Sequence, residues 1–358
     1  MRPLARVQAE ALRQRGIDVL VITSDQHPES DQARAYELVL DPRFRTAATW
    51  PASFATWRRI RGYRPHVVLT ELVRDPRWIA LPGRTPRIQL VHDHRPHDAA
   101  ERRPAYEHAL FDHWGAHSAA TITYSDYVAT AVAHRRDVAG TPVHVLPLTS
   151  DLDTNLVPAP VGPQRRRDFV MIGRLNPYKN LDVVLQAWHG HVTGGGWRGD
   201  NLMLIGDGRV SAGLPRHTQW RSGRYRYVDV VETLSAAKGS VAHYRRASQS
   251  GVQVLSMQLG VMPIVSTAGG LPEYQPPSCP AVGVDDVTGL AAAFDKLADP
   301  ATAAQAGIEA ARHYAKRFSV DRVADRLLDV IAAVLAGHSP ARSIAGPTAD
   351  TSRQARSR

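Results

Sequence analysis

The chain has few of the features that mark secreted, metal-binding or membrane-spanning proteins. Its 358 residues include a single cysteine, Cys279, which excludes an intramolecular disulfide, and no Cys/His spacing is typical of a zinc site. Apolar runs stay well short of the roughly 20 residues that span a bilayer. The N-terminus turns amphipathic within a few residues and lacks the pattern of a signal peptide. We therefore expect a cytoplasmic protein that is at most peripheral to a membrane.

Lysine is scarce as well, because only four of the 44 basic residues are lysines. The net charge of +10 is spread along the chain, whereas nucleic-acid-binding proteins gather charge on one face with interleaved aromatics. The composition argues against a nucleic-acid partner and suits anionic small molecules or an anionic membrane face. The segment 57–61 (Trp-Arg-Arg-Ile-Arg) fits a peripheral membrane contact, although such a run is more often a solvated helix face.

Short apolar strand-like runs alternate with helix-like segments, which is typical of an α/β fold whose parallel sheets are covered by helices on both faces. The expected strands are 17–23, 67–70, 88–91, 121–125, 169–172, 202–205 and 263–266. The expected helices are 3–15, 126–133, 180–188, 286–298, 301–316 and 320–335. A proline-rich stretch, 147–167, separates two sets of elements, so we expect two domains. Their boundaries are 1–155, a linker 156–167, 168–318, a C-terminal helix 319–337 and a disordered tail 338–358.

The most informative segment is Gly173-Arg174-Leu175 with Lys179-Asn180, which follows the strand 169–172 and precedes a helix. Two cations at a strand–helix turn can stabilise an anion, because the helix N-terminus adds free N–H groups and its dipole. Gly173 lets the backbone approach such a ligand closely. The alternative is an Arg and a Lys that are simply solvated on a loop.

Two further glycine segments follow strands in the same half. Gly269-Gly270-Leu271-Pro272-Glu273 has the form of a helix start and predicts a second anion site, or else a tight turn that needs glycine for backbone reasons. Gly206-Asp207-Gly208 ends the strand 202–205 and is, as a bare motif, a common turn.

In the first half, His92-Asp93 lies directly after the strand 88–91, at the carboxyl edge where open α/β sheets bind ligands. The run 92–97 contains three histidines. Metal binding is the weaker interpretation, because this spacing is not a standard ligand set. A polar surface loop is the alternative to a binding role for His92.

Taken in chain order, the second-half segments 173–180, 204–208, 259–266 and 269–273 resemble the C-terminal domain of retaining glycosyltransferases of family 4, which have the GT-B fold of two Rossmann-like domains. The first half of the chain resembles the same family more loosely, at residues 8–12 and 91–93. The resemblance implies an N-terminal acceptor-side domain and a C-terminal domain that binds a nucleotide-diphosphate sugar. It implies no metal and no cofactor beyond this donor, with Arg174 and Lys179 on the diphosphate and His92 facing the transferred sugar. The implied donor-binding residues are Gly173, Asn180, Gly206, Asp207, Gly208, Gly269, Gly270, Leu271 and Glu273.

By the same resemblance, transfer proceeds on the front face of the sugar with retention, and the departing phosphate takes the acceptor's proton. No enzyme nucleophile is then required. The acceptor is open between a glycan, a lipid-linked molecule and a small molecule. A role in carbohydrate or cell-envelope biosynthesis is implied.

The sequence departs from the family pattern in two places. Two glutamates eight positions apart are replaced by Ser248 and Ser256, which offer hydrogen bonds but no charge, and the segment 246–251 looks about ten residues short, as if an apolar strand were lost. We count both serines as donor-binding candidates. The chain also begins at the first helix, so the N-terminal sheet lacks its first strand or the true start lies upstream, and we favour the latter.

These departures keep two other functions open. The first is a catalytically impaired GT-B homologue that acts as a binding or scaffolding partner. The second is a sugar-nucleotide epimerase with the same fold. Turnover that Arg174→Ala abolishes would argue against the first, and conversion of the donor without an acceptor would reveal the second.

Overall fold

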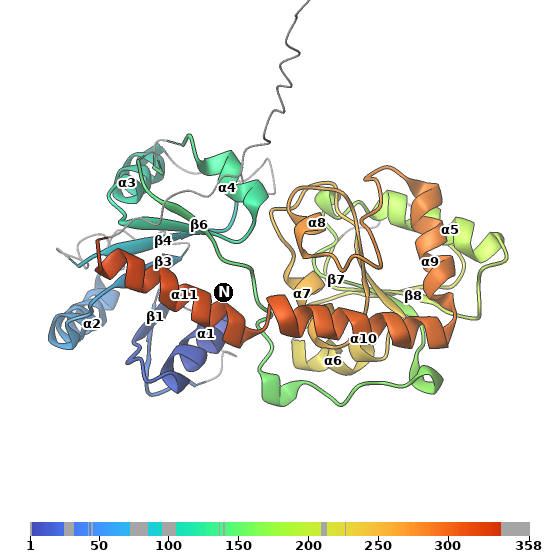
Figure 1. Ribbon diagram of the computed structural model, residues 1–358, viewed down its shortest axis with the longest axis horizontal. Coiled ribbons are helices and arrows are strands. Elements are labelled where there is room, and N and C mark those ends of the chain that lie inside the picture. The colour runs from blue at the N-terminus through green and yellow to red at the C-terminus, as the bar shows by residue number, and fades with distance from the viewer. Residues whose placement is uncertain are drawn as a thin grey trace, which may run out of the picture.

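The computed structural model describes residues 2–24, 32–41, 43, 46–71, 85–94, 105–135, 137–138, 140–208, 213–225 and 227–337. These residues form two α/β domains side by side, each with parallel strands between helices (Figure 1). The predicted tail 338–358 and the segment 95–97 lie outside the described residues. In the part of the chain that is described, no helix is long and apolar enough to cross a bilayer.

The N-terminal domain contains a four-stranded parallel sheet in the order β3-β4-β5-β6 and a separate parallel pair, β1-β2. The strands are β1 (Val21–Ser24), β2 (Glu37–Leu40), β3 (Val68–Glu71), β4 (Arg87–Val91), β5 (Ala120–Thr123) and β6 (Val143–Val145). The helices are α1 (Arg2–Gln14), α2 (Trp50–Tyr63), α3 (Ala105–Ala116) and α4 (Asp126–Val132). The strand expected over 17–23 is shorter and begins at Val21.

The C-terminal domain has one five-stranded parallel sheet in the order β11-β10-β7-β8-β9. Its strands are β7 (Phe169–Ile172), β8 (Leu202–Ile205), β9 (Thr218–Arg221), β10 (Gly239–Ala242) and β11 (Pro263–Val265). Its helices are α5 (Leu181–Thr193), α6 (Tyr227–Ser235), α7 (Gly251–Gln258), α8 (Leu271–Tyr274), α9 (Val287–Ala298) and α10 (Pro300–Arg317). Read from the β9 edge, these strands are third, second, first, fourth and fifth along the chain, which is the Rossmann arrangement and confirms the predicted fold class for this half.

The presence of β10 corrects one sequence expectation. The segment before Ser248 looked too short to keep an apolar strand, yet β10 lies there and is buried between β7 and β11. Its residues are small, Gly239, Ser240 and Ala242 among them, so its sequence does not look like a β-branched strand. A Cβ on Gly239 would lie 3.1–3.2 Å from the side chains of Leu297 and Phe169, so close packing explains the small residue.

The N-terminal strands follow the same arrangement, except that the described residues contain no counterpart of its central strand. In the C-terminal sheet the first strand, β7, joins β8 to β10; in the N-terminal domain nothing in the described residues joins β1 to β3. This gap lies where the arrangement has its first strand, and both expectations given above, a missing strand and an upstream start, predict it.

The last helix, α11 (Val320–Leu335), leaves the C-terminal domain and packs on α1 in the N-terminal domain (Figure 1). Leu4 and Leu12 of α1 share a buried cluster with Val323 and Leu327 of α11. Arg15 donates to Asp325 at 2.7 Å and to Asp321 at 3.2 Å. The first and last helices of the described chain thus form one packed unit.

The region predicted as a linker contains a residue that holds the C-terminal domain together. Arg166 is buried and donates to the carbonyl oxygens of Ser235, Ala237 and Gly260, at 2.7–3.1 Å. Its burial lowers the pKa of the guanidinium, and the three carbonyls satisfy most of its donors. The basic run 165–167 is therefore partly structural rather than only a solvated connector.

Candidate functional site

The predicted phosphate loop is held in place by the loop that follows β8. Gly173 N–H donates to the Ile205 carbonyl at 2.9 Å and Leu175 N–H to the Asp207 carbonyl at 2.7 Å. A Cβ on Gly206 would lie 2.4 Å from the Gly173 oxygen, and Gly206 has φ +132°. Only glycine fits there. The glycines of the segment 206–208 thus have a clear packing role, and their role in donor binding stays a prediction.

Lys179 lies at the end of the short turn η5 (Pro177–Lys179), where it is 5% exposed. Its Nζ is 3.8 Å from the ring centroid of Tyr244 and 5.5 Å from that of Tyr178. Burial, with a smaller contribution from Arg174, lowers the pKa of this amine to about 8. Among the described residues no carboxylate pairs with it. The amine is thus a buried cation held mainly by aromatic faces, an arrangement that an anionic ligand would complete.

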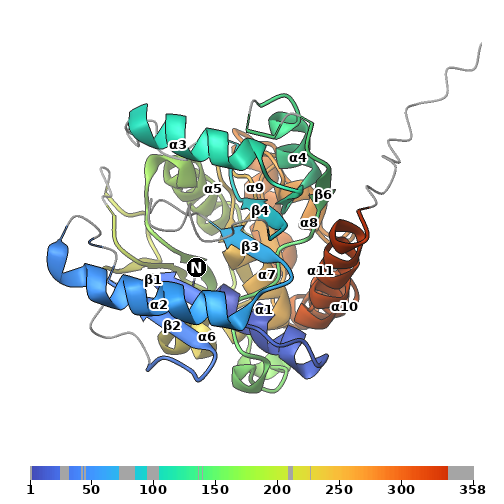
Figure 2. The same cartoon turned by 90° about the vertical axis from the view of Figure 1, so that its left-hand side faces the viewer.

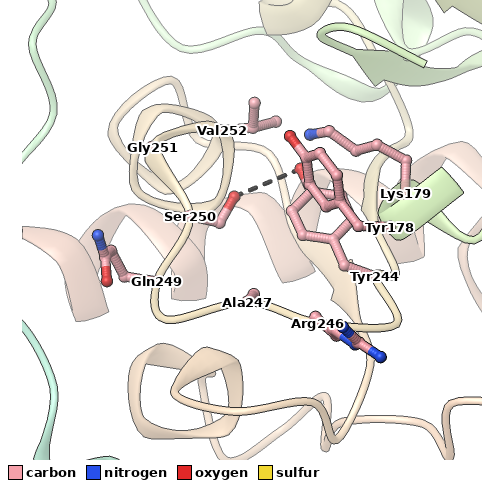
Figure 3. Close-up of a pocket in the computed structure, with 9 residues that line it drawn as sticks. All are labelled: Tyr178, Lys179, Tyr244, Arg246, Ala247, Gln249, Ser250, Gly251 and Val252. Carbon is pink, nitrogen blue, oxygen red and sulfur yellow. Dashed lines mark hydrogen bonds between the residues drawn. The ribbon is translucent and has the colours of Figure 1, made fainter. Parts of the chain in front are cut away.

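Beside this amine lies a pocket of about 170 Å³ between η5, the loop after β10 and the start of α7 (Figure 3). Gly251 and Val252, the first residues of α7, line it, and their N–H groups have no partner within the helix. Ser250 caps α7 by accepting from Gln253 N–H at 3.3 Å and also donates to the Tyr244 hydroxyl at 3.4 Å. The pocket therefore combines a cation with a helix N-terminus, which suits a phosphate group.

The other residues of the predicted phosphate loop divide into exposed and buried ones. Arg174 is exposed and close enough to Lys179 to affect its pKa. Asn180 is fully buried in a left-handed conformation with φ 57°, and its amide donates to the Val284 carbonyl at 2.7 Å. The geometry keeps Arg174 available for a ligand, whereas the amide of Asn180 fixes the turn against a neighbouring loop.

The segment 269–273 is docked onto the N-terminal domain. Glu273 accepts from the N–H groups of Asp126 and Tyr127 at 2.7 and 2.8 Å and so caps α4. A Cβ on Gly270 would lie 2.3 Å from the Ser248 carbonyl oxygen and 2.8 Å from Ser125 Cβ. Leu271 is fully buried, and α8 has only four residues. These contacts favour a structural role over the predicted second anion site, and the donor-binding roles of Gly269, Gly270, Leu271 and Glu273 stay predictions.

The two serines at the expected glutamate positions are both buried. The Ser256 hydroxyl donates to the Val252 carbonyl of its own helix at 2.7 Å. Ser248 is 2% exposed, and its carbonyl accepts from the Ser125 hydroxyl at 3.0 Å. Gln249 lines the pocket, whereas the Gln253 amide bridges the Leu271 carbonyl and the Gln275 side chain. Of the two glutamines, Gln249 is the one at the pocket, and its side chain points away from Lys179 (Figure 3).

In the N-terminal domain His92 lies at the carboxyl end of β4, as predicted, and is buried. Its Nε2 is 2.5 Å from Glu71 Oε1 at the end of β3, and its ring packs 4.7 Å from the Tyr124 ring at a 56° angle. Burial and the neighbouring Glu71 carboxylate raise the pKa of Tyr124 well above its usual range. The ends of β3, β4 and β5 therefore bring together a polar cluster of Glu71, His92 and Tyr124.

This cluster is joined to the pocket through the contact between the two domains. Tyr124 is followed by Ser125, whose hydroxyl donates to Ser248, and Ser248 is flanked by the pocket residues Ala247 and Gln249. The Tyr274 hydroxyl donates to the Tyr124 carbonyl and accepts from Leu148 N–H at 2.8 Å. The structure thus places the predicted sugar-facing histidine and the predicted phosphate grip on opposite sides of one interdomain contact.

The sequence reasoning missed three residues of this arrangement. Glu71 orients His92, Tyr244 covers the amine of Lys179, and Ser125 joins the domains. Glu71 ends the strand beside that of His92, so its place at the carboxyl end of a parallel strand is a signal that could have identified it. Tyr244 and Ser125 carry no comparable signal, because their roles depend on contacts across loops and domains.

Comparison with known proteins gives these sites a context. Residues 5–154 match the model of Glycosyltransferase Family 4, and residues 166–299 match the model of Glycosyl transferases group 1. The chain is built from two glycosyltransferase domains. No curated protein is detectably similar to it in sequence.

Solved structures show the same fold at low identity. Sucrose-phosphate synthase from Thermosynechococcus elongatus is 16% identical, with TM-score 0.71 and 93% of each chain covered. A glycosyltransferase from Rickettsia africae ESF-5 is 13% identical, with TM-score 0.67 and coverage of 93% of this chain and 94% of that one. HepE from Anabaena, solved with UDP and glucose, is 13% identical, with TM-score 0.60 and coverage of 88% and 100%. The predicted GT-B fold of parallel sheets flanked by helices is confirmed.

Proposed function

We propose that this glycosyltransferase moves a hexose from a nucleotide-diphosphate sugar to an acceptor hydroxyl, with retention and without a metal. The observation that carries the proposal is the buried Lys179 amine, which borders a pocket at the N-terminus of α7. A diphosphate fits a site with a cation and free N–H groups. HepE, which shares the fold, is solved with UDP and glucose, and this supports a nucleotide sugar as the donor.

In the proposed reaction, the bond between the anomeric carbon and the donor diphosphate breaks as the acceptor oxygen bonds to the same face of that carbon. The acceptor hydroxyl gives its proton to the departing phosphate oxygen. Arg174 and Lys179 stabilise the negative charge that develops on the leaving diphosphate, so a metal is not needed for this step. Because Arg174 is exposed and lies close to the buried Lys179, the two would contact the diphosphate from its solvent side and from within the pocket.

His92 is the proposed contact to the transferred sugar. Its Nε2 is engaged by Glu71, so a sugar hydroxyl would meet the other edge of the ring. The acceptor, a glycan, a lipid-linked molecule or a small molecule, would enter on the side of the N-terminal domain. We place the protein in the cytoplasm, in carbohydrate or cell-envelope biosynthesis, where nucleotide sugars are the donors.

The test is a thermal-shift screen of common nucleotide sugars followed by a turnover assay with the binders. A ligand that binds the folded state raises the unfolding temperature by mass action, and a concentration of 100 times Kd is equivalent to about 2.7 kcal/mol. Arg174→Ala is expected to weaken donor binding by tenfold or more, since a charge-assisted contact contributes roughly 1.5–3 kcal/mol. Arg165→Ala, an exposed arginine on the short turn 163–165, is the matched control and should bind as wild type. Absence of binding to every nucleotide sugar would contradict the proposal.

A second function is favoured by Ser248 and Ser256. Neither provides a carboxylate, and the Ser256 hydroxyl is bonded to its own helix, so donor hydroxyls would lose two charged partners. A catalytically impaired homologue that binds the nucleotide sugar or a partner protein would have these properties. Nucleotide binding without turnover would favour this second function, whereas turnover that is lost in Arg174→Ala would exclude it.

A further inference from the structure

Helix α2 presents an unusual outer face. Its inward face consists of Ser53, Thr56 and Ile60, so this surface helix buries two small polar residues and one isoleucine. Two large aromatics face outward instead: Trp50 is 46% exposed and Phe54 is 63% exposed. This is the reverse of the usual pattern, in which a surface helix turns its large apolar residues toward the core.

The exposed aromatics belong to a continuous strip with two arginines. At 3.6 residues per turn, the i, i+4, i+7, i+8 and i+11 positions of α2 share one side. These positions are Trp50, Phe54, Trp57, Arg58 and Arg61, which we call the α2 strip. The Arg61 guanidinium lies 4.6 Å above the Trp57 ring, so aromatic and cationic groups are in contact along it.

The sequence around α2 is free of acidic residues. Between Asp41 and Glu71 there are six arginines and no Asp or Glu. The whole chain, by contrast, has 34 acidic residues beside its 44 lysines and arginines. The strip therefore lies in a locally basic region that no neighbour in sequence neutralises. Helix α2 lies at the end of the N-terminal domain remote from the C-terminal domain, so a flat partner could reach it without entering the space between the domains (Figures 1 and 2).

We propose that the α2 strip docks the protein on an anionic phospholipid surface. Trp and Phe suit the boundary between headgroups and acyl chains, because a flat apolar ring is buried there at little cost in side-chain entropy. Arg58 and Arg61 bury their stems beside these rings and keep their guanidinium groups at the lipid phosphates. RNA could also bind the arginines, but proteins that bind single-stranded RNA stack its bases on aromatic rings inside a charged groove. The aromatics of the α2 strip lie on the convex surface of a helix, so the strip suits a lipid surface better than RNA. This inference does not depend on the proposed reaction.

The test is flotation of the full-length protein with vesicles of equal parts phosphatidylglycerol and phosphatidylcholine, compared with phosphatidylcholine alone. Binding is expected to the anionic vesicles only, and to fall as salt is added. Trp50→Ser combined with Phe54→Ser should weaken the partition coefficient by roughly tenfold or more, because the apolar area inserted is lost. If the double variant is unstable, Phe54→Ser alone replaces it, because Phe54 is the more exposed of the two side chains and its loss should also weaken the partition.

A matched pair of variants tests the orientation of the helix. Arg58→Gln removes one charge from the strip and should weaken partition about fivefold, while Arg59→Gln removes the same charge about 100° around the helix and should weaken it less than about twofold. Both arginines are exposed, so their folding stabilities should match wild type. Equal effects of the two variants, no binding to anionic vesicles, or strip-dependent binding to heparin in place of vesicles would each overturn the proposal.

Discussion

Replacing Lys179 by methionine should make the free protein more stable while it destroys the proposed diphosphate site. The Lys179 amine is buried beside Tyr244 without a carboxylate partner among the described residues, and its pKa falls from 10.5 to about 8. A shift of this size corresponds to about 3 kcal/mol of unfavourable free energy for the charged form in the folded state. Methionine removes the charge and fills similar space. We therefore expect Lys179→Met to raise the free energy of unfolding by about 1–3 kcal/mol at pH 7.

The sign of the pH dependence follows from the same shift. The unfolded chain keeps this proton up to pH 10.5, whereas the folded protein releases it near pH 8. Between these values the unfolded state binds more protons, so wild-type stability rises with pH. The advantage of Lys179→Met should be fully present below pH 8 and should vanish as the pH approaches 10.5. Urea unfolding of both proteins across this range measures it.

Lys238 provides the matched control, because it is also a buried lysine of the C-terminal domain. Its Nζ is 2.6 Å from Asp200 Oδ1 and 2.6 Å from the Ala298 carbonyl, so it has the partners that Lys179 lacks. Lys238→Met leaves the buried Asp200 unpaired and should lower the free energy of unfolding by about 3–5 kcal/mol. If Lys179→Met is destabilised like Lys238→Met, or if UDP still raises its unfolding temperature as in wild type, the reasoning fails.

Two further predictions concern the contacts around the site. Glu71→Gln keeps the shape of the side chain but removes the charge beside His92, and kcat should fall roughly fivefold to tenfold at unchanged KM for the donor, as measured by steady-state kinetics. An unchanged kcat would show that the contact does not position His92 for the reaction. Gly270→Ala places a Cβ 2.3 Å from the Ser248 oxygen and should lower the free energy of unfolding by about 1–3 kcal/mol in urea, whereas Gly213→Ala, which meets no atom within 4 Å, should change it by less than about 0.5 kcal/mol. Equal effects of the two glycine variants would refute the packing argument.

The sequence predicted the domain type and many elements because these depend on local patterns. The helices over 286–298, 301–316 and 320–335 appear as α9, α10 and α11 within a few residues, since their apolar periodicity and their caps, such as Asp286 and Asp299, are local. The sequence did not predict strand β10, because close packing favours small residues there and the strand is therefore poor in the β-branched residues typical of strands.

The site was predicted less completely, because its contacts join distant segments. The position of Lys179 after a strand was readable, but its burial under Tyr244 depends on two loops more than 60 residues apart. The glycines 269 and 270 suggested an anion site, yet their neighbours are the Ala247 and Ser248 carbonyls, which no local pattern reveals. Arg166 looked like part of a basic linker for the same reason, since its carbonyl partners lie 69–94 residues away.

The pairing of α1 with α11 has a consequence for synthesis of the protein. The face of α1 that carries Leu4 and Leu12 is covered by α11, which begins at Val320. During translation this apolar face therefore stays uncovered until nearly the whole chain has been synthesised. At about 5–20 residues per second, that interval is of the order of half a minute. The C-terminal sheet can close before α11 arrives, whereas the N-terminal domain cannot complete its core. We therefore expect the second domain of the chain to be the first to reach its native state.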